Sequence, residues 1–190
     1  MKLRILGATK KILDKDFIEI SIAEFISITG GIIAGLIFVT LIDKFEVFPA
    51  LLVLIPGLLA MQGSINGSLA ARLTVDLYLK KIPKKFQFSS HLFKHVVASL
   101  FLVLFISIFL GVLAFTVTLI FFEVVNLKII LVSVISSLLA IFCQLPLAVA
   151  GVFWTFNKGL DPDDVMGPYV TVLGDIIGIL SILVVILLTV

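Results

Sequence analysis

The chain has 190 residues, of which 61% are apolar and 14% are charged, and its net charge is +2. A soluble domain is about 45–50% apolar and about 25% charged, so too few polar side chains remain here to cover a soluble fold. The composition predicts an integral membrane protein and excludes a sizeable soluble domain. The small net charge gives no support to nucleic-acid binding, and the single cysteine, Cys143, excludes a disulfide within the chain.

Five apolar segments follow one another along the chain, and each is long enough to cross a bilayer as a helix. We expect the spans at about residues 18–42, 47–79, 92–122, 127–156 and 168–190, after a short cytoplasmic segment at residues 1–17. None of the segments alternates like a strand over its length, and an open sheet could not satisfy its backbone in lipid. The predicted fold class is an all-α membrane protein with five transmembrane helices.

The basic residues predict how the chain lies in the membrane. Residues 1–17 hold five Lys or Arg, the connection from Arg72 to Lys94 holds six, and the fourth connection holds Lys158. The other two connections hold only Lys44 and Lys128. Basic residues concentrate in the cytoplasmic loops of membrane proteins. We therefore expect the N-terminus in the cytoplasm and the C-terminus outside, with the chain in the cell membrane.

Four lysines lie close together at residues 80–85, around Pro83. Two interpretations stay open for them. We favour a topology signal in a solvated loop, and the alternative is a patch that attracts anionic lipid.

The last span contains a carboxylate, Asp175, in an otherwise apolar sequence. A charge at the centre of a membrane helix costs at least ~2.5–3.5 kcal/mol, so it is a functional hypothesis by default. The residues near Asp175 on the same helix have small side chains: Thr171, Gly174 and Gly178. A hard cation such as Mg²⁺ keeps several waters and needs only one or two carboxylates with carbonyls. We expect Asp175 and Thr171 to contact a divalent cation; the alternative is a structural Asp that is paired with a neighbouring helix or protonated.

The second and fourth spans carry further polar residues. After Pro56-Gly57, the second span repeats its polar or small residues one helical turn apart over residues 62–68. The fourth span has a row at Ser136, Ala140, Gln144 and Ala148. Both patterns fit either pore lining or close packing with interhelical hydrogen bonds. The candidate pore-lining residues are Gln62, Gly63, Gly67, Gly174, Gly178 and Gln144.

Two further features are a row of small residues in the first span and an acidic segment before the fifth span. In the first span Ser27, Gly31 and Gly35 share the spacing of one turn, which we interpret as a packing face. Before the fifth span, Asp161-Pro162-Asp163-Asp164 fits a helix N-terminus that is capped by Asp161, and a metal motif is the alternative. We also expect Asp161, Asp164 and Glu24 to attract cations on the cytoplasmic side.

Two stretches resemble the MgtE and solute carrier 41 magnesium transporters. Residues 54–74, LIPGLLAMQGSINGSLAARLT, resemble the second helix of that family, and residues 159–175, GLDPDDVMGPYVTVLGD, resemble its last loop and fifth helix. The resemblance implies a single five-helix module without cytoplasmic sensor domains, and a pathway for hydrated Mg²⁺ at the interface of two such modules. It also implies that the acid at Asp175 and a backbone carbonyl at Thr171 contact the ion.

The second helix of the family carries Gly-Asn after its proline turn. Here Ser64 stands at the asparagine position and Asn66 follows two residues later, so we expect ion contacts from both. The expected function is transport of Mg²⁺ or another divalent cation by a homodimer in lipid, with no cofactor, no catalytic residues and room for a separate regulatory subunit. The alternatives are an ion-coupled exchanger, a non-conducting scaffold subunit and a membrane enzyme that uses Asp161 and Asp164.

Overall fold

The computed structural model describes residues 2–45, 48–87 and 89–189, with side chains from residue 16 onward. Over these residues the chain is helical, without strands, and five helices are long and apolar enough to cross a membrane. The elements are α1 (Lys2–Val39), the 3₁₀ turn η1 (Ile42–Lys44), α2 (Leu51–Tyr78), α3 (Ser90–Phe122), α4 (Lys128–Lys158) and α5 (Pro162–Thr189). The prediction of an all-α protein with five membrane helices is confirmed.

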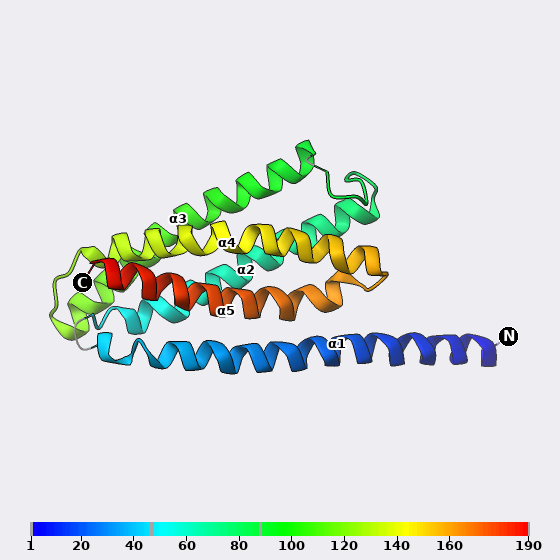
Figure 1. Cartoon of the computed structure of the whole chain (residues 1–190), viewed down its shortest axis with the longest axis horizontal. Helices are drawn as coiled ribbons and strands as arrows, with labels where there is room; N and C mark the ends of the chain where they lie inside the picture. Colours follow the sequence, from blue (N-terminus) through cyan, green and yellow to red (C-terminus); the bar gives the residue numbers. More distant parts are fainter. Residues whose placement is uncertain (1, 46–47, 88, 190) are drawn as a thin grey trace.

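The five helices form one elongated bundle (Figure 1). Helix α1 runs along α5 and projects beyond the bundle at its N-terminal end, while α4 lies between α3 and α5. The N-terminus lies at the same end as the α2–α3 and α4–α5 connections, and the C-terminus lies at the opposite end (Figure 1). We call the first of these the basic end, because the connections rich in lysine lie there.

Two helices begin earlier than the hydropathy of the sequence suggests. Helix α1 already begins at Lys2, and α5 begins at Pro162 instead of near residue 168. The Asp161 Oδ1 atom accepts a hydrogen bond of 3.0 Å from the Asp163 N–H, which confirms the capping interpretation of this segment. The early start puts Asp175 thirteen residues after Pro162 and fourteen before Thr189, in the middle of α5.

The packing face of α1 differs from the expected one. Among the described residues nothing lies within 4 Å of the position that a Cβ would take at Gly31 or Gly35, so these two glycines do not form the contact with a neighbouring helix. Instead Gly30 lies directly against the Val172 side chain of α5. Within one chain the contact glycine thus lies one residue from the expected row, a rotation of about 100° around the helix, and packing of that row against another molecule stays a prediction.

The connection between α2 and α3 is fixed by polar contacts at the basic end. The buried Asp76 carboxylate lies 2.9 Å from His95 Nε2 on α3 and 3.7 Å from Lys81 Nζ in the connection. Ser89 caps α3, because its Oγ accepts a hydrogen bond of 3.2 Å from the Leu92 N–H. These contacts hold the lysine-rich connection against the ends of both helices.

Candidate cation pathway

Helices α2 and α5 approach each other closely through glycines. A Cβ atom on Gly174 of α5 would lie 3.6 Å from the backbone nitrogen of Gly63 on α2. One turn further along α5, a Cβ on Gly178 would lie 2.7 Å from Leu59 Cδ2. Since residue numbers rise on one helix as they fall on the other, the two helices are antiparallel where they cross. Gly174 and Gly178 therefore serve first as the contact between α2 and α5.

Beside this crossing lies a group of polar residues that we call the polar strip: Ser64 on α2, and Thr171 and Asp175 on α5. Ser64 and Thr171 are exposed and Asp175 is half-buried. Because the helices are antiparallel and right-handed, the residues that follow the two contact glycines, Ser64 and Asp175, turn to the same side of the crossing. There is open space beside Gly63, because no described atom lies within 4 Å of the position that a Cβ atom would take on it.

The polar strip lies at the mid-length of both helices. Ser64 lies thirteen residues after the start of α2 at Leu51 and fourteen before its end at Tyr78. Asp175 lies at the same distances from the start and the end of α5. At 1.5 Å per residue, Asp175 lies about 20 Å from either end of its helix. A helix of this length spans the bilayer, so the carboxylate is near the depth at which transporters commonly place their ion sites.

The Asp175 carboxylate has no hydrogen bond or ion pair with another group in the described part of the chain. The Thr171 hydroxyl donates a hydrogen bond of 3.0 Å to the carbonyl of Gly167, within its own helix. Within one chain, Asp175 is thus not the structural Asp with a helical partner that the sequence left open. Among the described residues no three His, Cys, Asp or Glu side chains gather into a metal site, so a single chain offers one carboxylate here.

Three amide side chains form what we call the buried amide cluster: Gln62 and Gln144, which were expected to line a pore, and Asn66, which was expected to contact the ion. Their exposed fractions are 0%, 1% and 0%. Asn66 Nδ2 donates a hydrogen bond of 2.5 Å to Gln144 Oε1, and Gln62 Nε2 donates one of 3.1 Å to the carbonyl of Ser137. This cluster joins α2 to α4, on a face of α2 that points away from the polar strip. Of the two interpretations of the fourth span, pore lining and interhelical hydrogen bonding, the described residues show the hydrogen bonds.

Acidic residues gather at the basic end, near the start of α5. A cavity of about 330 Å³ there is lined by Asp16, Glu19, Tyr78, Lys84, Phe156, Gly159, Leu160 and Asp161. Asp164 is half-buried in the first turn of α5, and Glu24 is exposed on α1 but does not line the cavity. Asp16 and Glu19 were not among the residues expected to attract cations here. Their spacing of three residues, which puts both on one face of a helix, was the available signal.

Comparison with protein families gives one match. A family model for MgtE, described as a divalent cation transporter, matches residues 55–185. The matched range contains the polar strip, the buried amide cluster and the acidic residues at the start of α5. Neither a curated protein nor a solved structure matches the chain.

Proposed function

Because this multi-pass membrane protein belongs to the MgtE family of divalent cation transporters, we propose that it conducts Mg²⁺ along the polar strip, at an interface between two copies of the chain. The observation that carries the proposal is Asp175, an unpaired, half-buried carboxylate in the middle of a membrane helix. A divalent cation supplies the opposite charge that no described residue of the chain provides. The family is one of transporters and not of enzymes.

The open side of the polar strip supports an interface between two copies. In a single chain Ser64 and Thr171 are exposed, and Asp175 beside them would face lipid. A carboxylate in contact with lipid costs at least ~2.5–3.5 kcal/mol, so the strip needs water or protein against it. A second copy would cover the strip and bring a second Asp175 to the same ion. Two carboxylates and retained waters meet the demands of Mg²⁺, which sheds its water reluctantly.

In this proposal the residues around Asp175 have distinct tasks. Thr171 and Ser64 supply oxygen atoms for the waters of the ion, and Gly63 leaves room for them. Asn66 positions α2 through the buried amide cluster, and we place it outside the ion path because its side chain is almost fully buried against α4. The acidic residues that line the cavity at the basic end concentrate cations at one mouth of the pathway.

The driving force is the membrane potential. If the basic end is cytoplasmic, as the positive-inside rule predicts, an interior-negative potential of 100 mV favours entry of a divalent ion by about 4.6 kcal/mol. No nucleotide or other cofactor is needed for movement in that direction.

The test is Mg²⁺ uptake into liposomes that contain only the purified protein, under an imposed potential. We expect Asp175→Asn to lower uptake by about tenfold or more, which corresponds to a loss of about 1.4 kcal/mol or more. Its folding is expected to stay intact, because none of the described residues bonds to the carboxylate. Glu123→Gln is the control: it also neutralises one carboxylate, but one that is exposed at the C-terminal end of α3 and belongs neither to the polar strip nor to the acidic cavity.

Each other outcome contradicts a defined part of the proposal. Uptake that requires Na⁺ or H⁺ on the opposite side would indicate an exchanger, and a folded dimer without uptake would indicate a scaffold subunit. Full uptake by Asp175→Asn would remove the polar strip from the pathway. Uptake by protein that is monomeric in the membrane would rule out the interface between two copies.

A further inference from the structure

A second feature of the molecule lies away from the polar strip, between α3 and α4. It is an apolar groove of about 440 Å³, whose lining includes Leu92 and Val96 of α3, Pro146, Ala150 and Phe153 of α4, and Phe86 of the α2–α3 connection. The groove lies toward the basic end, where α3 leans away from α4 (Figure 1). Helices α2 and α5, which carry the polar strip, contribute no residue to its lining.

The α2–α3 connection closes the groove at the basic end. The ring of Phe86 packs edge-on against Phe153 of α4, with 5.5 Å between the ring centroids. Beside it, Asn157 Nδ2 donates a hydrogen bond of 3.3 Å to the backbone carbonyl of Lys84. Because Asp76 also holds this connection through Lys81, the end wall of the groove is anchored on both sides. The groove is therefore a slot with a fixed end rather than an open furrow.

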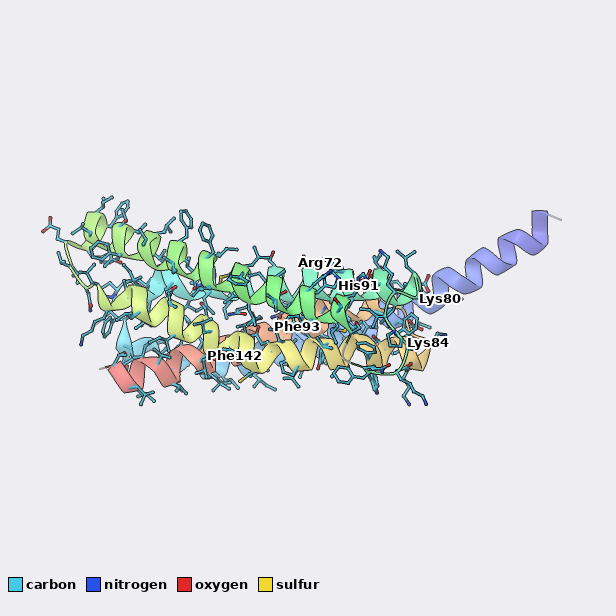
Figure 2. The ribbon with its side chains drawn as sticks, turned by 90° about the horizontal axis from the view of Figure 1, so that it is seen from above. Arg72, Lys80, Lys84, His91, Phe93 and Phe142 are labelled. Atoms are coloured by element: carbon cyan, nitrogen blue, oxygen red, sulfur yellow. The ribbon has the colours of Figure 1, made fainter. Side chains whose placement is uncertain are left out.

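Lysines lie near the closed end. Lys85 directly precedes Phe86 and is exposed, and Lys158 is exposed at the end of α4. Lys84 belongs to the acidic cavity: its Nζ lies 5.6 Å from the centroid of the Phe156 ring, and both residues line that cavity and not the groove. Figure 2 shows Lys80 and Lys84 at the basic end of the bundle, where α1 projects beyond it. With the basic end at a membrane surface, Lys85 would lie at the depth of lipid headgroups and the groove at the depth of acyl chains.

An apolar slot with cations at one end complements an anionic phospholipid. From Leu145 to Phe153 the groove follows about 12 Å of α4, which suits the first part of an acyl chain. We propose that the groove binds an acyl chain of one anionic phospholipid, from the leaflet at the basic end, and that Lys85 binds its phosphate. Of the two interpretations of residues 80–85, the geometry of the groove favours the lipid patch.

The charge part of the proposal is tested by native mass spectrometry of the full chain released from nanodiscs. The nanodiscs contain equal amounts of phosphatidylglycerol and phosphatidylcholine with identical acyl chains. We expect the protein to retain one phosphatidylglycerol per chain in preference to phosphatidylcholine. Lys85→Gln should reduce this preference about fivefold, the usual effect of one basic residue near an anionic surface. Lys80→Gln, the same charge change at the end of α2, is the control and should keep the preference of the unmodified protein.

The groove itself is tested by filling it. Val96→Trp places an indole in the slot and should abolish retention of both lipids, while Val112→Trp, on an exposed part of α3 outside the groove, should not. Equal retention of the two lipids by the unmodified protein would overturn the proposal, as would undiminished retention by Val96→Trp. If Val96→Trp abolished dimer formation without changing the amount of bound lipid, the proposal would also be overturned, and a second copy of the chain would be identified as the occupant of the groove. Lys85→Gln keeps the proposal testable if Val96→Trp does not fold, because Lys85 is fully on the surface.

Discussion

Two faces of helix α2 carry polar residues that are neighbours in sequence but have different surroundings. Gln62 and Asn66 point toward α4 and hydrogen-bond there, and both are almost fully buried. Ser64 lies between them in the sequence and is exposed on the polar strip beside Asp175. Membrane helices use hydrogen bonds between side chains to hold together, whereas an unpaired charge at the same depth is costly. An exposed polar side chain beside an unpaired charge in a span is thus a better candidate for ion transport than an amide that is buried against a neighbouring helix.

The largest stability effect should come from breaking the buried amide cluster. Gln144→Leu leaves the Asn66 amide buried without its acceptor, which costs about 1–3 kcal/mol of unfolding free energy. Removing both partners with Asn66→Leu and Gln144→Leu should recover most of that loss. This recovery is expected because Asn66 Oδ1 and Gln144 Nε2 already have no partner among the described residues. Unfolding in lipid or detergent measures all three variants, and a double variant less stable than either single one would contradict this account.

A smaller loss of stability should come from the crossing of α2 and α5. The Cβ of Gly178→Ala would meet Leu59 Cδ2 at 2.7 Å, so the leucine must move, at a cost of about 1 kcal/mol. The Cβ of Gly174→Ala would lie at ordinary contact distance from Gly63, so this variant should unfold like the unmodified protein. The same unfolding assay compares the pair. Equal losses from both alanines would mean that the two helices do not cross at these residues.

The smallest effect should come from Thr171→Val, which keeps the shape of the side chain and its backbone carbonyl. The Thr171 hydroxyl is already bonded to the Gly167 carbonyl, so the ion relies mainly on other oxygen atoms. We expect Mg²⁺ uptake in liposomes to fall about fivefold or less, in line with one neutral hydrogen bond. A loss as large as that from Asp175→Asn would make the hydroxyl, and not the carboxylate alone, essential for the ion.

The number of helices and the start of α5 could be predicted because both depend on local sequence. Length and hydropathy give the five spans, and Asp161-Pro162 marks the helix start that the hydrogen bond to Asp163 confirms. Hydropathy alone began the last span too late, because the acids of the first turn interrupt the apolar sequence. The carboxylate at Asp175 stood out for the same local reason, as a charge in an apolar helix.

The partner of each helix face could not be predicted from spacing. Gly30 and Gly31 are equally small, yet only Gly30 contacts α5, since the choice depends on where the neighbouring helix lies. In the same way, a period of four residues describes both Gln62 with Asn66 and Ser64 with Ser68. Which of these pairs faces α4 depends on contacts between residues more than 70 positions apart in the chain.

The most direct test of the account compares two serines that are replaced by cysteine in a chain without Cys143. Ser64→Cys lies on the polar strip, and Ser137→Cys is fully buried beside Gln62. Cys143 is exposed and is first replaced by alanine. The measurement is the rate at which a water-soluble methanethiosulfonate reagent modifies each cysteine in liposomes, with and without Mg²⁺. The account predicts that Ser64→Cys reacts, that Mg²⁺ slows this reaction, and that Ser137→Cys does not react; equal rates at the two positions, or a rate at Ser64→Cys that ignores Mg²⁺, would contradict it.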